Sequence, residues 1–236
     1  MPKPHAAITP MPFSRRHFSS RMLGAACAGL AALPALSQPK APVEGVNYVR
    51  LERPVPQTQP GHIEVIEFFW YECPHCYAFE PALEAWSQHL PGDVALTRVP
   101  IWFREEPFGA QQRLYYAIES LGLMARLHRR VFDAVHKQHV RLRTPEDIAA
   151  FMLSNGVDPV KFMTAFGSFA VQSKAQQARQ LAAAYRIDAV PAMGVQGRYF
   201  TNGTLANANG GAAMPAGSND RMLGVVDALI VKVRGV

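Results

Sequence analysis

Residues 67–86 read EFFWYECPHCYAFEPALEAW and place two cysteines, Cys73 and Cys76, two residues apart directly after an apolar run. The stretch His62–Trp70 is rich in β-branched and aromatic residues, which predicts a buried strand. Pro74 suits the first position of a helix, and the apolar residues that follow it have helical spacing. The two cysteines are therefore expected where a strand delivers the chain to the start of a helix.

The rest of the chain predicts an α/β unit that is interrupted by helices. Thr144, with Pro145 and Asp147 behind it, is a typical helix start, and Asp158 before Pro159 predicts another. The other expected elements are strands at 46–51 and 94–101, helices between about 109 and 186, a hairpin of 192–196 and 198–201, a loop over 202–219 and a last helix near 223–233. The fold class is thus α/β, with a helical insertion at about 105–187.

Residues 1–37 have the features of an export signal. They hold four of the 24 Lys and Arg residues and none of the 18 Asp and Glu residues. A small-residue apolar run at 22–36 follows the charged start, and this run is shorter than the roughly 20 residues of a membrane span. The SRRHF stretch at 14–18 resembles a twin-arginine export motif. Cys27 would leave with this segment, so residues 38–236 form the expected mature domain.

Charge and composition exclude several classes of protein. The apolar content of 49% and the charged content of 18% are those of a globular protein rather than a disordered one. Most of the formal charge of +6 comes from residues 1–37. The nearly balanced remainder indicates no nucleic-acid partner.

A Cys-x-x-Cys motif at a helix start is suited to thiol–disulfide exchange. The first sulfur lies beside unpaired backbone N–H groups and the positive end of the helix dipole, which favours the thiolate of Cys73. His75 adds to this effect. Cys76, one turn into the helix, is expected to be shielded and to act as the resolving thiol. Because the reduced, ionised form is stabilised, the disulfide would be oxidising.

Two other roles for the cysteines remain open at this point. A structural staple across two residues closes a very small loop and brings little chain-entropy benefit. A metal site needs about four ligands, and no third cysteine follows residue 37. His136 and His139 could meet on one helix face, but surface histidines are usually solvated. Both roles are weaker explanations than an exchange site.

The stretch EFFWYECPHCYAFEP closely resembles the active-site segment of the DsbA family of periplasmic dithiol oxidases, including the Pro-His pair between the cysteines. The later AVPAMGVQGRY resembles the family's Val-Pro segment and its following hairpin. The resemblance implies a thioredoxin-like fold with an inserted all-helical domain. It departs in the Trp-Tyr pair at 70–71 and in a 202–219 loop that is longer than the common form, which leaves substrate preference open.

The resemblance also implies roles for particular residues. Cys73 would be the exposed nucleophile and Cys76 its partner; Pro74 and His75 would complete the catalytic motif, with His75 tuning the potential. Pro191 would be a cis-proline facing the disulfide, and Val190 would offer its backbone to an extended substrate peptide. Glu67 would be a buried acid behind the disulfide, and Arg98 its basic partner. An outward-facing Glu67 near the end of its strand is the alternative.

Six aromatic residues near the motif could form an apolar docking patch, although core packing explains at least half of them. They are Phe68, Phe69, Trp70, Tyr71, Tyr77 and Phe79.

The expected function is that of an exported, periplasmic dithiol–disulfide oxidase. It would donate the Cys73–Cys76 disulfide to reduced, unfolded proteins through a mixed disulfide at Cys73, without a metal or an organic cofactor. The resemblance implies a DsbB-like membrane quinone reductase as its reoxidant. Residues 38–62 are too short for a dimerisation domain, so a monomer is expected. The alternatives are a reductase or isomerase of the same fold and a Cys-x-x-Cys metal-binding protein.

Overall fold

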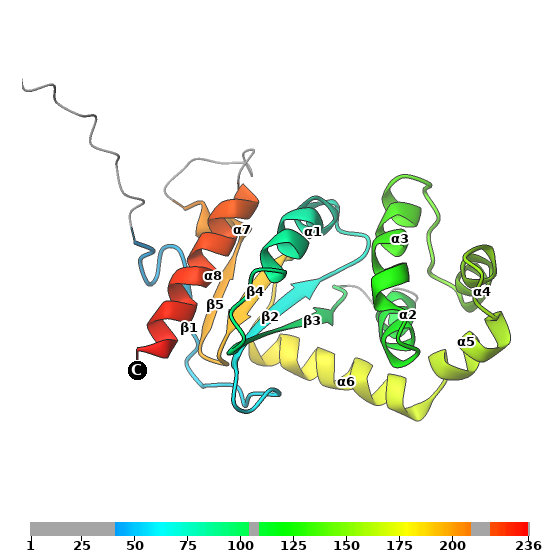
Figure 1. The fold of residues 1–236 in the computed structure, drawn as a ribbon, viewed down its shortest axis with the longest axis horizontal. Helices are drawn as coiled ribbons and strands as arrows, with labels where there is room; N and C mark the ends of the chain where they lie inside the picture. The colour runs from blue at the N-terminus through cyan, green and yellow to red at the C-terminus, as the bar shows by residue number, and fades with distance from the viewer. Residues whose placement is uncertain (1–40, 104–108, 209–217, 236) are drawn as a thin grey trace, which may run out of the picture. The chain divides into compact units, whose positions relative to one another are not determined.

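The computed structural model describes residues 41–103, 109–208 and 218–235. A five-stranded mixed sheet runs in the order β1-β5-β4-β2-β3 (Figure 1). The strands are β1 (Val49–Arg50), β2 (Ile63–Phe69), β3 (Val94–Pro100), β4 (Ala192–Val195) and β5 (Tyr199–Asn202). Only β2 and β3 are parallel, and the other neighbouring pairs are antiparallel.

The strand before the cysteines lies inside the sheet, as its sequence predicts. Residues Glu64–Phe69 of β2 are all buried, because β3 and β4 flank the strand and helices cover both sides of it. The predicted strands at 62–70 and 94–101 and the predicted hairpin are confirmed, with ends that differ by at most one residue. The strand expected at 46–51 is reduced to the two residues of β1.

Eight helices occur in the described part of the chain. They are α1 (Pro74–Ser87), α2 (Gly109–Ser120), α3 (Met124–His136), α4 (Pro145–Ser154), α5 (Pro159–Phe166), α6 (Phe169–Ala184), α7 (Gly203–Ala206) and α8 (Ser218–Arg234). Helices α1 and α8 pack on one side of the sheet, whereas α2–α6 follow β3 and build a helical region beside it (Figure 1). Lys40–Val236 form one compact unit, which contains both the sheet and this helical region.

Side-chain caps start three of the helices in the helical region. The Thr144 hydroxyl accepts a hydrogen bond from the Asp147 backbone N–H at 3.1 Å. The Asp158 carboxylate accepts one from the Val160 N–H at 2.8 Å, and Ser168 caps α6 in the same way. Such caps satisfy N–H groups that have no partner within the helix. The predicted starts at Thr144 and Asp158 are confirmed.

Two local predictions were wrong, and others fall outside the described residues. The segment expected to be a loop from residue 202 contains the short helix α7, whose cap is the Asn202 side chain accepting from the Leu205 N–H. The prediction that His136 and His139 could meet on one helix face is wrong. Helix α3 ends at His136, and His139 lies beyond the helix with a φ of 58°. The expected signal at 1–37, with Cys27, lies outside the described residues, as does the 209–217 part of the loop. None of the described helices is long and apolar enough to cross a membrane.

Gly194 in β4 allows the ring of Tyr185 to approach the sheet backbone closely. A Cβ atom at position 194 would lie 2.4 Å from Tyr185 Cε1. We therefore expect Gly194→Ala to lower the free energy of unfolding by about 1–3 kcal/mol through overpacking, measured by urea unfolding. Gly224→Ala is the matched control, because no atom lies within 4 Å of its added Cβ and alanine favours a helix. Equal unfolding midpoints for Gly194→Ala and the wild type would contradict this account.

Candidate active site at the Cys73–Cys76 motif

The two cysteines lie at the junction of β2 and α1, as the sequence predicts. Cys73 is the N-cap of α1 and has extended backbone angles, and Pro74 occupies the first turn. The Cys73 backbone N–H donates to the Trp70 carbonyl at 3.0 Å, and its carbonyl accepts from the Tyr77 N–H at 3.1 Å. This turn aims the start of the helix, with its unpaired N–H groups, at the first sulfur.

The two thiols differ in accessibility, although less than predicted. Cys76 is fully buried, and Cys73 keeps 8% of its surface exposed. Cys73 is therefore the more accessible thiol, but the prediction that it is exposed is wrong. Part of the reason is that the segment at Val190 packs against it, with the Cys73 Sγ donating to the Val190 carbonyl at 3.4 Å. Both cysteines are free thiols in the structure.

The surroundings separate the acidities of the two thiols. The pKa of Cys73 is lowered to about 6, and the largest cause is a hydrogen bond from the Cys76 side chain. Burial opposes this shift. The backbone N–H groups of Cys76 and His75 and the charge of His75 lower the pKa further. Burial, followed by the hydrogen bond with Cys73, raises the pKa of Cys76 well above its ordinary value. At neutral pH the reduced site therefore holds one thiolate, on Cys73, and one thiol.

This pKa predicts how the reduced protein titrates. Because the folded-state pKa of Cys73, about 6, lies below the ordinary value of 9.0, the thiolate stabilises the reduced protein at high pH, and this contribution disappears as the pH falls through 6. Between pH 6 and 9 the contribution of this thiolate to the free energy of unfolding of the reduced protein rises by about 1.4 kcal/mol per pH unit. Thiolate ultraviolet absorbance should show a midpoint near pH 6. In Cys76→Ala the midpoint should rise, because the largest cause of the shift is removed; an unchanged midpoint would contradict that assignment.

His75 and Pro74 lie between the cysteines and are both exposed. His75 acts on Cys73 through its backbone N–H and its side-chain charge, and both effects lower the pKa of the thiol. Pro74 has no N–H to leave unsatisfied at the start of the helix. The position of His75 fits the tuning role predicted for it.

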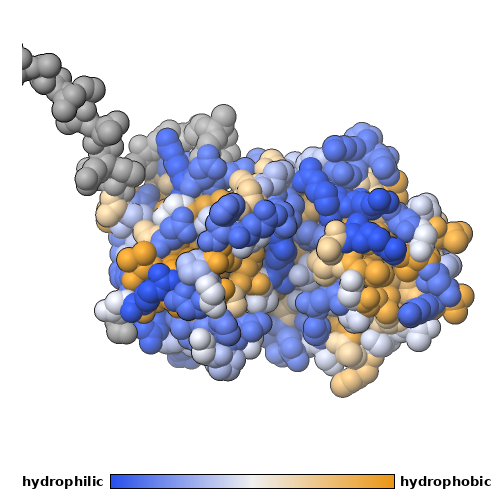
Figure 2. All heavy atoms as spheres, viewed as in Figure 1, coloured by the Kyte–Doolittle hydropathy of each residue, from blue (hydrophilic) through white to orange (hydrophobic). Residues whose placement is uncertain are grey.

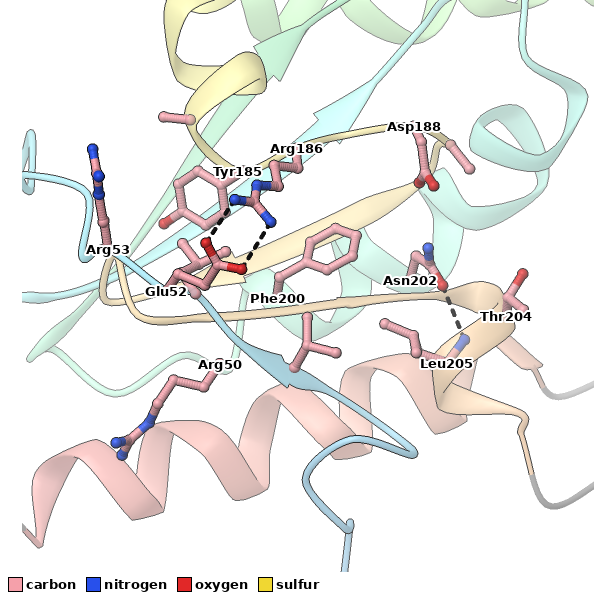
Figure 3. Close-up of a pocket in the computed structure, with 14 residues that line it drawn as sticks. Arg50, Glu52, Arg53, Tyr185, Arg186, Asp188, Phe200, Asn202, Thr204 and Leu205 are labelled. Carbon is pink, nitrogen blue, oxygen red and sulfur yellow. Dashed lines mark hydrogen bonds and ion pairs between the residues drawn. The ribbon is translucent and has the colours of Figure 1, made fainter.

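The Val190–Pro191 segment faces the motif from a distant part of the chain. Its peptide bond is cis, Pro191 is buried, and Val190 is partly exposed. Directly before it, Asp188 and Ala189 line a hollow of about 840 Å³ between the end of α6 and β1. Figure 3 shows the Glu52–Arg186 ion pair bridging this hollow. Because the Val190 carbonyl contacts Cys73 Sγ, the structure brings both predicted substrate-binding residues, Val190 and Pro191, to the cysteines.

Glu67 and Arg98 form the predicted ion pair behind the motif. Glu67 is fully buried, so the outward-facing alternative is wrong, and its Oε2 lies 3.3 Å from Arg98 Nε. Paired positions on the parallel strands β2 and β3 bring the two residues together. Burial, and next the charge of Glu80, raise the pKa of Glu67, whereas Arg98 opposes them. Glu67 also contributes to the raised pKa of Cys76.

Further members of this buried cluster were missed in the sequence. Arg98 also contacts Glu80 Oε1 at 3.2 Å and Glu84 Oε2 at 3.0 Å. His128 Nε2 lies 3.4 Å from Glu80 Oε1, and its Nδ1 lies 2.8 Å from the Tyr71 hydroxyl. The helical spacing of the sequence could have predicted that Glu80 is buried, because it lies on the same face of α1 as the buried positions 76, 79 and 83. A carboxylate in an apolar helical stripe needs a charged partner.

The helical region holds the turn before Cys73 in place. Arg143 binds the Glu72 carboxylate through two nitrogens, each at 2.6 Å. The amide nitrogen of Gln111 donates to the same carboxylate at 3.0 Å. His136 Nε2 lies 2.8 Å from the Tyr71 carbonyl oxygen. These contacts fix the two residues that directly precede the nucleophilic cysteine.

The aromatic residues near the motif belong mostly to the core. Four of the six predicted for a docking patch are at most 1% exposed, namely Phe68, Phe69, Tyr71 and Phe79. Trp70 and Tyr77 remain partly exposed, and Phe103, exposed by 44%, packs against Trp70. The apolar surface beside the cysteines is therefore smaller than the six aromatic residues suggested. In the described residues no group of three or more His, Cys, Asp and Glu side chains is arranged to hold a metal ion.

A thioredoxin-like sheet, a Cys-x-x-Cys pair at a helix start, an ionisable first thiol and a cis-proline beside it define a thiol–disulfide oxidoreductase. Residues 64–209 match the family model of the DSBA-like thioredoxin domain. The thiol:disulfide interchange protein DsbA of Pseudomonas aeruginosa is 42% identical over 191 residues, covering 80% of this chain and 85% of the relative. The DsbA of Azotobacter vinelandii is 41% identical over 219 residues, covering 90% and 97%.

Solved structures of DsbA proteins also resemble this chain. The crystal structure of Pseudomonas aeruginosa DsbA superposes with a TM-score of 0.74 at 41% identity and covers 82% of this chain and 95% of that one. The DsbA oxidoreductase of Xylella fastidiosa gives a TM-score of 0.73 at 31% identity, covering 84% and 100%. The chain belongs to the DsbA family, and the thioredoxin-like fold and the thiol–disulfide oxidoreductase class predicted from the sequence are confirmed.

Proposed function

We propose that this protein is a dithiol oxidase that donates the Cys73–Cys76 disulfide to reduced substrate proteins. The observation that carries the proposal is the position of Cys73 at the N-cap of α1, beside Val190, where the hydrogen bond from Cys76 lowers its pKa to about 6. A stable thiolate favours the reduced enzyme over its disulfide, and this raises the reduction potential. The substrates are the cysteine thiols of other proteins. The name of the relatives, thiol:disulfide interchange protein DsbA, describes the same exchange chemistry.

The reaction takes place in two exchange steps. A substrate thiolate attacks Cys73 Sγ, the S–S bond to Cys76 breaks, and its electron pair passes to Cys76, which takes up a proton because its pKa is high. A second substrate thiolate then attacks the substrate sulfur of the mixed disulfide and releases Cys73 as a thiolate, a good leaving group because its pKa is low. The substrate loses two electrons and the enzyme gains them.

The surroundings of the cysteines support distinct roles for the other residues. Val190, whose carbonyl lies 3.4 Å from Cys73 Sγ, is placed to orient an extended substrate peptide together with Pro191. The Glu67–Arg98 pair sets the charge behind Cys76, and His75 lowers the pKa of Cys73 from the exposed side. The exchange chemistry itself takes place at the two sulfurs.

The setting of this activity forms part of the same proposal. Residues 1–37 are an export signal with a twin-arginine motif. The enzyme works as a monomer in the periplasm. A DsbB-like membrane quinone reductase takes up the electrons of the reduced enzyme. The family membership and the charged start of the chain support this setting.

Oxidation of a reduced, unfolded protein by the purified mature chain tests the proposal. We expect stoichiometric oxidised enzyme to convert two substrate thiols to one disulfide, followed by turnover when an oxidant is supplied. A reductase would instead reduce substrate disulfides when a reductant is supplied, and an isomerase would rearrange them without net oxidation. A metal-binding protein would hold stoichiometric metal and oxidise no dithiol; any of these three results would overturn the proposal.

A further inference from the structure

A basic surface borders the active site on α3 and on the segment after it. Residues 124–143 contain six Arg and Lys residues and one acid, Asp133. Helix α3 buries Leu127, Val131 and Ala134 completely, so its charged residues lie on the opposite face. Figure 2 shows hydrophilic side chains gathered over this helix. We call Arg126, Arg129, Arg130, Lys137 and Arg141 the α3 basic surface.

Direct contacts connect this surface to the cysteine motif. The Arg129 guanidinium lies 4.5 Å from the ring centroid of Tyr77, the residue after Cys76. His136, directly before Lys137, stacks on the same ring at 4.7 Å. The α3 basic surface therefore begins at the ring of Tyr77, in the first turn of α1.

The positive charge of the surface is only partly neutralised within the protein. Asp133 contacts both Lys137, at 3.1 Å, and Arg129, at 3.5 Å, so a single carboxylate serves two cations. Arg130 binds the neutral side chain of Asn155 at 3.0 Å, and its charge remains. Arg126 and Arg141 are exposed.

Two acids near the motif in the described part of the chain, Glu72 and Glu84, already have basic partners outside this surface. Glu72 binds Arg143, which we therefore leave out of the α3 basic surface, and Glu84 binds Arg98. Arg98 is shared with Glu67 and Glu80, so the excess of positive charge lies on the α3 basic surface itself, which has five cations and the single carboxylate of Asp133. An extended polypeptide that reaches Cys73 along α3 would meet this charge.

We propose that the α3 basic surface attracts acidic segments of reduced substrate proteins and steers their cysteines to Cys73. This inference rests on the proposed function. Exposed charges change association rates more than final affinity, and opposite charge raises encounter rates by a factor of about 10 to 1,000 at low salt. Cysteines with nearby Asp and Glu residues would therefore be oxidised fastest.

Three short dithiol peptides test the proposal, with flanks of Asp and Glu, of Asn and Gln, or of Lys and Arg. Oxidation by the disulfide form of the mature protein is followed by stopped-flow fluorescence. In the triple variant Arg126→Gln, Arg130→Gln, Lys137→Gln we expect the acidic peptide to react about fivefold more slowly at low ionic strength. The difference should shrink above about 0.5 M salt, and the neutral peptide should change by less than about twofold.

A second triple variant controls for total charge. Arg53→Gln, Lys161→Gln, Arg198→Gln removes three exposed cations from other elements, and it should react with the acidic peptide as the wild type does. An equal loss in both triple variants, or no loss in either, would overturn the proposal. So would unchanged peptide rates combined with lost binding to anionic phospholipid vesicles, because the surface would then serve a membrane. Failure of the wild type to oxidise even the neutral peptide would overturn the proposed function instead.

Discussion

Cys76→Ser is expected to lose catalytic turnover and to accumulate a mixed disulfide at Cys73. Without Cys76 no internal disulfide forms, so substrate dithiols are no longer oxidised above the uncatalysed rate. The low pKa of Cys73, about 6 in the native site, still leaves a reactive fraction of thiolate near neutral pH. This thiolate attacks a disulfide of an oxidised peptide, and no second enzyme thiol releases the adduct. Mass spectrometry of the intact protein measures the adduct.

The matched variant Cys73→Ser separates the roles of the two cysteines. It retains only the thiol of Cys76, which is fully buried and whose pKa is raised. We therefore expect no catalytic turnover and little adduct from this variant under the same conditions. Faster adduct formation by Cys73→Ser than by Cys76→Ser would show that the assignment of nucleophile and resolving thiol is reversed.

Arg98→Met is expected to cause the largest loss of stability among the substitutions discussed. Arg98 lies within 3.3 Å of the carboxylates of Glu67, Glu80 and Glu84, and the first two are buried. Removing the cation leaves two buried acids without it, which costs roughly 3–5 kcal/mol. The free energy of unfolding of the oxidised form, measured with urea at pH 7, tests this value.

The pH dependence identifies the cause of that loss. Burial raises the pKa of Glu67, and loss of Arg98 raises it further. A raised carboxyl pKa stabilises the protonated folded form at low pH, and this stability is lost as the pH rises. The deficit of Arg98→Met relative to the wild type should thus be smaller at pH 5 than at pH 8. Arg98→Lys, which keeps the charge, should retain most of the stability; an equal deficit for Arg98→Met at both pH values would contradict the electrostatic account.

The sequence predicted the parts of the site that depend on local pattern. The continuous apolar run of β2 and the proline after Cys73 are short-range signals, and they placed the cysteines at a helix start. The pairing of Glu67 with Arg98 was suggested by the family resemblance, and the structure contains it because β2 and β3 are neighbouring parallel strands.

Contacts between distant segments could not be predicted in this way. The Tyr71–His128 and Glu72–Arg143 contacts join residues 57 and 71 positions apart, and no periodicity relates them. The accessibility of Cys73 was overestimated for the same reason, since Val190, 117 positions away, packs against its sulfur. Tertiary packing, rather than local propensity, determines these features.

The equilibrium of the purified mature protein with reduced and oxidised glutathione tests the central claim most directly. Thiol trapping, or the fluorescence of Trp70, whose carbonyl accepts from the Cys73 N–H, reports the fraction of reduced protein. The account predicts an equilibrium that favours the reduced protein, with a reduction potential well above the value of about −270 mV for thioredoxin. A potential close to that of thioredoxin would make the protein a reductase and would contradict the proposed function.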